Sequence, residues 1–107
     1  MLRATSRLAL VLALALAACR GDAEKCELAC RNYYTLTFWD KADAEIAKLP
    51  AADQEQARSK MLAKFTSDIE NGVIGCIGQC QSANNTEQTE CMIAAKTASA
   101  AKACVED

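Results

Sequence analysis

The residues of this chain that could do chemistry are its cysteines, because seven of its 107 residues are cysteine and none is histidine. Such a set can form disulfides, hold a zinc ion or exchange electrons as a redox dithiol. Without histidine the chain lacks the commonest general base and one member of a Ser-His-Asp triad. We therefore expect no enzymatic activity, no metal site and no cofactor. Six of the seven cysteines form an even set: Cys26, Cys30, Cys76, Cys80, Cys91 and Cys104.

Four of these six fall into two CX3C pairs, Cys26 with Cys30 and Cys76 with Cys80. On a helix, residues four apart lie on one face on consecutive turns. Their Cβ atoms are about 6 Å apart, whereas a disulfide needs about 3.8 Å, so bonds between the pairs are favoured over bonds within them. A zinc site with four cysteine ligands is the alternative for the same four residues. A redox dithiol is disfavoured, because the chain has no C-x-x-C motif.

The seventh cysteine, Cys19, ends an apolar N-terminal segment. Residues 1–7 carry two arginines and no acid, and residues 8–18 are unbroken apolar sequence. This order is typical of a secretory signal peptide. Eleven apolar residues are too few for a transmembrane helix, which needs about 20. We therefore expect residues 1–18 to be removed, and an exported chain of this size with six further cysteines to be held by disulfides.

The junction Leu16-Ala17-Ala18-Cys19 resembles the lipobox of bacterial lipoprotein precursors. The resemblance implies that the Cys19 sulfur takes a diacylglycerol and that the new N-terminus is acylated, with palmitate as a typical chain. Two or more acyl chains anchor a protein stably to a membrane. The alternative is ordinary cleavage near Ala18, which would leave Cys19 as a spare thiol.

The same resemblance predicts where the protein resides. In that family an Asp after the lipidated cysteine favours retention at the inner membrane, and this chain has Arg20 there. We therefore expect a protein of the cell envelope, anchored in the outer membrane and facing the periplasm or the cell surface. Residues 19–22 would be the lipidated tether, and residues 23–107 a single small cysteine-rich domain.

Charge excludes one class of partner. The chain has 12 basic and 14 acidic residues, and two of the basic residues lie in the segment expected to be removed. The mature chain would carry a net charge of about −4, and it has no basic patch of the kind that binds nucleic acid. The partners we expect are the membrane, through the lipid, and an envelope protein or polymer.

The cysteines must be positioned by helices, because good helix formers dominate the mature chain and no region is rich in strand signals. Asp22 is a plausible N-cap, and Pro50 marks a boundary between two helices. The expected fold is all-α: an antiparallel hairpin of residues 22–48 and 51–81, followed by helix over 86–105. Gly72 could interrupt the second helix, or the three glycines Gly72, Gly75 and Gly78 could let another backbone approach closely.

The hairpin fixes the cysteine pairing. In an antiparallel hairpin, bonded residues are equidistant from the centre of the turn. Cys26–Cys80 and Cys30–Cys76 share a centre at residue 53, next to Pro50, whereas the crossed pairing gives two centres four residues apart. We therefore predict Cys26–Cys80 and Cys30–Cys76.

Two arrangements are open to Cys91 and Cys104. In a straight helix they would lie about 20 Å apart, too far for a disulfide. A break near Thr97 would let the two halves fold together and form Cys91–Cys104. The alternative is a straight helix with a chain reversal at Gly72, in which Cys80 bonds Cys91 and Cys104 returns to the first CX3C pair. We favour the break.

Four aromatic residues lie within one short segment: Tyr33, Tyr34, Phe38 and Trp39. They are too many for one helix stripe, so we expect most to be core and one or two to form an exposed interaction surface. The function we expect is a lipid-anchored structural or protein-interaction module. The twin CX3C motifs also resemble those of small mitochondrial intermembrane-space chaperones. That resemblance implies the alternative, a periplasmic chaperone-like or thiol-redox factor.

Overall fold

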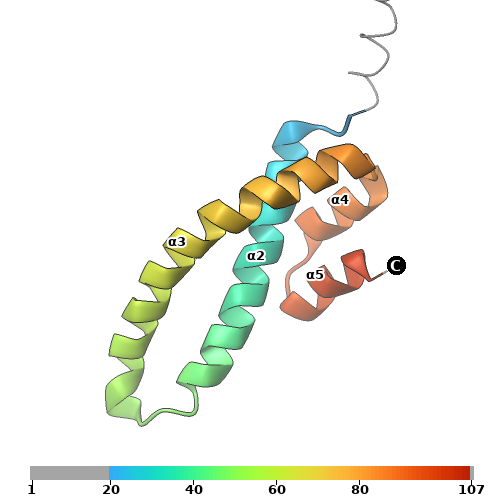
Figure 1. The fold of residues 1–107 in the computed structure, drawn as a ribbon. Coiled ribbons are helices and arrows are strands. Elements are labelled where there is room, and N and C mark those ends of the chain that lie inside the picture. The colour runs from blue at the N-terminus through green and yellow to red at the C-terminus, as the bar shows by residue number, and fades with distance from the viewer. Residues whose placement is uncertain (1–19, 107) are drawn as a thin grey trace, which may run out of the picture.

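The structure, a computed structural model, describes residues 20–106. They form four helices and no strand within that range: α2 (Ala23–Ile46), α3 (Ala51–Ala83), α4 (Thr86–Ala94) and α5 (Ala98–Val105). Helices α2 and α3 are the two arms of a long antiparallel hairpin, and α4 and α5 fold back beside α2 (Figure 1). The expected all-α, disulfide-stapled hairpin is thus confirmed. None of the helices within residues 20–106 has the length and apolar character that crossing a membrane requires.

The helix boundaries follow from local sequence chemistry. Asp22 caps α2, because its carboxylate accepts hydrogen bonds from the backbone N–H groups of Glu24 and Lys25. Pro50 precedes the first turn of α3, where its missing N–H costs nothing. At the far end, Asn84 adopts a left-handed conformation (φ 46°) and ends α3. Asn85 then caps α4 through a bond from the Gln88 N–H.

The C-terminal segment is broken, as we favoured. Helix α4 ends at Ala94, and the Thr97 side chain caps α5 by accepting a bond from the Ala100 N–H. Helices α4 and α5 therefore pack against each other and against α2. The straight-helix alternative is wrong, because the break brings Cys91 and Cys104 together.

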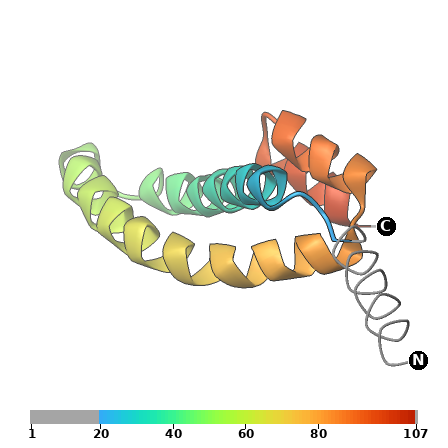
Figure 2. The ribbon, with the colours of Figure 1, turned by 90° about the horizontal axis from the view of Figure 1, so that it is seen from above.

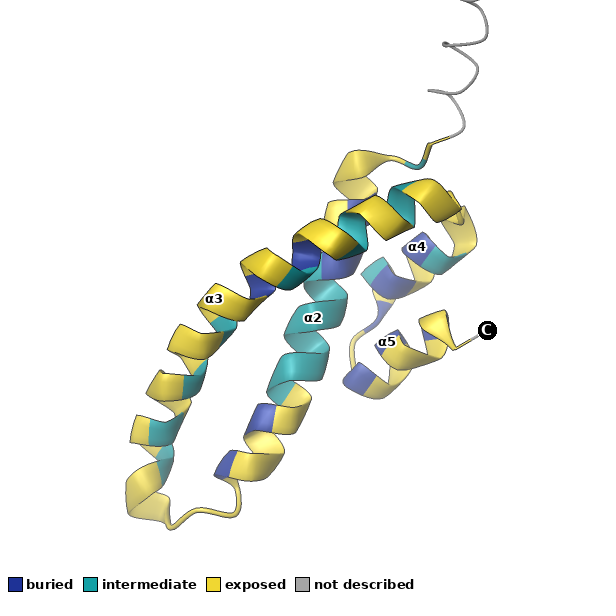
Figure 3. Cartoon of the chain, in the orientation of Figure 1, coloured by how far each residue is buried: buried dark blue, intermediate teal, exposed yellow. Residues whose placement is uncertain are grey.

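Helix α2 lies between α3 on one side and the α4–α5 pair on the other (Figure 2). Its middle section, residues 31–39, is half-buried all the way round, whereas most of α3 is exposed on its outer face (Figure 3). Two small buried clusters hold these layers together. The first joins Ala29 to Met92 and Cys104, and the second joins Cys30 to Ile69 and Val73.

The contact between α2 and α3 follows a row of residues spaced by four along α2: Cys26, Cys30, Tyr34, Phe38, Ala42 and Ile46. Four residues overshoot one helical turn by about 40°, so this row winds around α2. Rows of this spacing are typical of helices that cross at an angle. Accordingly, α3 crosses α2 near the disulfides and lies to its side nearer the turn (Figure 1).

Two expectations about α3 need correction. In the sequence of α3, an apolar stripe that steps alternately by three and four residues predicts one buried face: Leu62, Phe65, Ile69, Gly72 and Cys76. Leu62 is nevertheless 54% exposed. Phe65 is half-buried as predicted, but Met61 is half-buried in place of Leu62, because the α3 contact row mostly steps by four residues. Gly72 does not interrupt α3. Its missing side chain admits Tyr34, whose Cε1 atom would lie 3.0 Å from a Cβ at this position.

Candidate functional site

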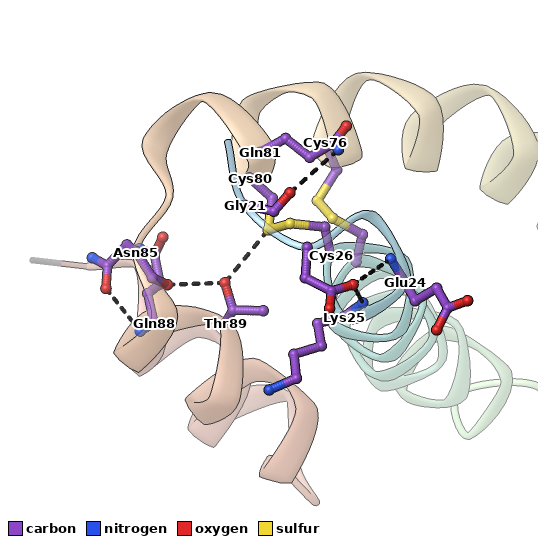
Figure 4. Close-up of a disulfide and its surroundings, with 12 residues drawn as sticks. Gly21, Glu24, Lys25, Cys26, Cys76, Cys80, Gln81, Asn85, Gln88 and Thr89 are labelled. Carbon is purple, nitrogen blue, oxygen red and sulfur yellow. Dashed lines mark hydrogen bonds between the residues drawn. A yellow bond between two sulfur atoms is a disulfide. The ribbon is translucent and has the colours of Figure 1, made fainter. Parts of the chain in front are cut away.

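Two disulfides pin one end of the hairpin. Cys26 bonds Cys80 and Cys30 bonds Cys76, with Cα–Cα distances of 5.7 and 5.9 Å (Figure 4). These are the pairs favoured by the shared centre at residue 53. Each closes a loop of roughly 50 residues, which in the chain-entropy model stabilises the fold by about 4 kcal/mol. Because the four sulfurs are bonded in pairs, they have no thiolate to offer a zinc ion.

The third disulfide, Cys91–Cys104, joins α4 to α5 with a Cα–Cα distance of 5.7 Å. Cys91 is exposed, whereas Cys104 is buried against Ala29 and Met92. Within the described residues, no disulfide joins the α4–α5 pair to the hairpin. The pair is therefore held to α2 by packing and polar contacts alone.

Asn32 supplies the main polar contact between α2 and the α4–α5 pair. Its side-chain amide donates to the carbonyl oxygens of Met92 at 2.7 Å and Ala95 at 2.9 Å. Met92 lies in the last turn of α4 and Ala95 directly follows the helix, so no helical N–H is present to satisfy their carbonyls. Nothing in the local sequence predicted this role, because the partners are 60 and 63 residues away.

An ion pair reinforces the same interface. Lys25 Nζ lies 2.7 Å from Glu90 Oε1, and both side chains are about half exposed. The hydrogen bond to Glu90, together with its charge, raises the pKa of Lys25. On another face of α2, Arg31 bonds Glu27 at 3.0 Å and Glu70 of α3 at 3.2 Å, and these contacts raise the pKa of the guanidinium.

The structure does not bring the four clustered aromatic residues onto one surface. Tyr33 packs against the buried cluster that α2 shares with α4 and α5. Tyr34 packs against the cluster shared with α3 and covers Gly72. Phe38 and Trp39 meet Phe65 of α3, with ring centroids 5.1 and 5.9 Å from it. All four are half-buried, so each contributes to packing.

Trp39 closes one face of the hairpin. The Arg58 guanidinium lies 5.4 Å from the centroid of its ring, within cation–π range. The same guanidinium donates a 2.6 Å bond to Asp43. These contacts join α2 to α3 on the Trp39 side of the hairpin.

The hairpin is hollowed where Phe38 faces α3. A hollow of about 270 Å³ is lined by Tyr34, Thr37 and Phe38 of α2 and by Phe65, Asp68 and Ile69 of α3. A second hollow of about 200 Å³ shares Phe38 and Asp68 with the first and continues toward the turn. We call the two together the hairpin groove. It is the candidate functional site, because apolar hollows with a few polar groups are typical of binding sites.

The second hollow combines an apolar floor with a charged rim. Phe38, Ala42 and Met61 are buried or half-buried. Its charged side chains are exposed, and none of them takes part in the ion pairs found among the described residues. They are Lys41, Glu45, Lys64 and Asp68.

The N-terminal tether lies at the opposite end from the turn. The Gly21 N–H donates a 2.9 Å bond to the Gln81 carbonyl, and the Gln81 side-chain amide returns a 3.4 Å bond to the Gly21 carbonyl (Figure 4). Both residues are next to the Cys26–Cys80 disulfide in space. Cys19 itself lies outside the described residues, and Arg20 and Gly21 alone separate it from the cap of α2.

Comparison with known proteins gives no match: no protein-family model, no curated protein and no solved structure matches the chain. The hairpin groove therefore rests on this chain's own geometry. Of its residues, Tyr34 and Phe38 belong to the aromatic segment that the sequence singled out. Phe65 belongs to the apolar stripe that the sequence predicts, whereas Met61 was missed, although its four-residue spacing from Phe65 could have indicated it.

Proposed function

We propose that this protein is a lipid-anchored module of a bacterial envelope that presents its hairpin to a partner protein. Lipid on the Cys19 sulfur would hold the stapled end of the hairpin at the membrane. The hairpin groove and the turn would then point away from the lipid surface. The protein would belong to the outer membrane, since Arg20 stands where the lipoprotein resemblance associates an Asp with inner-membrane retention.

The observation that carries this proposal is the fixed position of the tether. Gly21 is bonded to Gln81 at the stapled end, so a lipid two residues earlier has little freedom to move along the body. From Cys26 to Ile46, α2 spans 21 residues, or about 30 Å of helix. An anchored hairpin of this length could hold a binding surface clear of lipid head groups.

The anchor is tested by metabolic labelling. The full chain, produced in a bacterium fed an alkyne-tagged palmitate, should carry the label and sediment with membranes. Cys19→Ser should lose both, while keeping its three disulfides on a non-reducing gel. Arg20→Ala, the neighbouring control, should remain labelled. A Cys19→Ser protein that still carries palmitate, or a parent chain that is never labelled, would contradict the proposed anchor.

A second candidate function, a thiol-redox factor, is favoured by the exposure of Cys91. A thiolate must reach a sulfur to exchange with it, and the other five disulfide-bonded cysteines are buried or half-buried. The two functions are separated by redox titration in glutathione buffers with mass spectrometry of alkylated peptides. If the protein is a redox factor, the glutathione buffer should reduce its Cys91–Cys104 disulfide near the cellular glutathione potential. If all three disulfides stay oxidised to below about −300 mV, this candidate is refuted.

A further inference from the structure

We infer that the hairpin groove binds an amphipathic helix of a partner protein, one with an apolar stripe and charges in the order basic, acidic, basic at four-residue spacing. This inference deepens the proposed interaction module and rests on it. It names the surface and the chemistry of the partner.

The first argument is continuity with the helix packing inside the chain. Along α2, Ala29 and Tyr33 pack against the cluster that includes Met92 of α4 and Cys104 of α5. The next positions of the same four-residue row are Thr37, Lys41 and Glu45, and these line the groove. Helices α4 and α5 therefore cover this row near the disulfides, and no helix of the described chain covers its continuation toward the turn.

The second argument is the apolar content of the groove. Rings of Tyr34, Phe38 and Phe65 surround the larger hollow, whose volume of about 270 Å³ exceeds that of one large side chain. Helix-in-groove recognition inserts apolar side chains from one face of the incoming helix into such hollows. The anchor residue we expect is therefore aromatic or a large aliphatic.

The third argument is charge. Asp68 borders both hollows, Lys41 and Lys64 border the second from opposite helices, and Glu45 follows one turn after Lys41. From the stapled end the rim therefore has the order acidic, doubly basic, acidic, in steps of four residues or about 6 Å along each helix. Since none of these groups has an ion-pair partner among the described residues, they are available to a ligand. A helix carrying Lys, Glu and Lys at positions i, i+4 and i+8 would oppose each of them.

The same rim argues against a second copy of this chain. In a parallel pair of anchored copies related by a two-fold axis, each α2 would face the partner's α3. Because Lys41 and Lys64 lie at about the same height along the hairpin, Lys41 of one copy would then face Lys64 of the other, and like charges would come together.

The test uses two synthetic helical peptides of identical composition and net charge. Both carry the same Leu and Phe stripe, one with Lys-Glu-Lys at the three charged positions and the other with Glu-Lys-Lys. The protein is the full chain with Cys19→Ser, exported so that its disulfides form. We expect the Lys-Glu-Lys peptide to bind about tenfold more tightly in calorimetry, since each mismatched exposed charge changes affinity by a few-fold. Its binding should shift the NMR signals of Phe38 and Phe65.

The matched variants isolate the rim. Lys41→Glu with Lys64→Glu should weaken the Lys-Glu-Lys peptide about tenfold and abolish its advantage over the permuted peptide. Lys96→Glu with Lys102→Glu makes the same change in net charge on exposed residues outside the groove and should alter neither affinity. Circular dichroism of each variant checks that the helices are retained.

Several results would overturn the inference. These are equal affinities for the two peptides, no binding of either, an equal effect of the control variant, or a dimer in ultracentrifugation that buries the groove. Because the soluble protein carries no lipid, the test is independent of the anchor. If the peptides do not bind as expected but the chain is acylated, only the proposal for the groove is refuted. If the peptides bind but the chain is not acylated, only the proposed anchor is refuted.

Discussion

The close approach of Tyr34 to Gly72 provides the sharpest test of how the hairpin packs. A Cβ at position 72 would lie 3.0 Å from Tyr34 Cε1 and 3.2 Å from Cζ, well inside the 3.5–4.0 Å at which carbon atoms attract. At Gly75 and Gly78 a Cβ would meet nothing within 4 Å. The three glycines lie in one helix, so they differ in packing rather than in secondary structure.

These distances set opposite expectations for the three substitutions to alanine. At Gly75 and Gly78, alanine should stabilise the helix by up to about 1 kcal/mol, the difference in helix propensity. At Gly72 the same gain is offset by overpacking, which costs about 1–3 kcal/mol. The Tyr34 ring also meets the Tyr33 ring, with centroids 5.8 Å apart, so a shift away from position 72 would disturb that contact. Gly72→Ala should therefore be less stable than Gly75→Ala by about 1–3 kcal/mol.

The assay is urea unfolding followed by circular dichroism with the disulfides intact. A second background makes the comparison decisive: Tyr34→Ala removes the ring, so adding Gly72→Ala to it should be stabilising. This reversal is a coupling energy of about 1–3 kcal/mol between two residues in contact. If Gly72→Ala is as stabilising as Gly75→Ala in the parent chain, the ring gives way freely. The close approach would then have no part in holding the hairpin.

Two further predictions concern the interface between α2 and α4. Asn32→Ala should destabilise the protein by about 1–3 kcal/mol, because the carbonyl groups of Met92 and Ala95 lose their donor. The rate of amide hydrogen exchange should then rise in α4 and α5 more than in α3. An equal rise in all helices would contradict this role of Asn32. Glu90 raises the pKa of Lys25 above its ordinary value of 10.5, so the pair's contribution should be complete below pH 10.5 and lost as the pH rises through the higher folded-state pKa. Parent and Lys25→Met should therefore differ in free energy of unfolding at pH 9 and converge at more alkaline pH, whereas a constant difference would refute this role of the ion pair.

The hairpin could be predicted from the sequence because its constraints are regular. Two CX3C pairs that share a centre at residue 53, close to Pro50, leave one simple pairing, and the same centre relates Tyr34 to Gly72. The caps Asp22 and Thr97 are local signals and were equally readable.

The sequence could not predict how the helices turn relative to each other. Each four-residue step rotates the contact row by about 40°. Phe38 lines the hairpin groove, whereas its neighbour Trp39 contacts Phe65 and Arg58 of α3. Leu62 was misplaced for the same reason. The role of Asn32 depends on backbone carbonyl groups that lie far away in the sequence, so no local sequence pattern could predict it.

The position of the Cys26–Cys80 disulfide has a mechanical consequence. If a partner bound near the turn pulled away from an anchored N-terminus, the tension would enter at Cys26 and divide there. One path would follow α2, and the other would cross the disulfide and follow α3. Both arms would share the load in parallel, whereas without this bridge and the neighbouring Cys30–Cys76 bond α2 alone would carry it. A hairpin whose two arms are joined by disulfides at its anchored end is therefore suited to resist stretching.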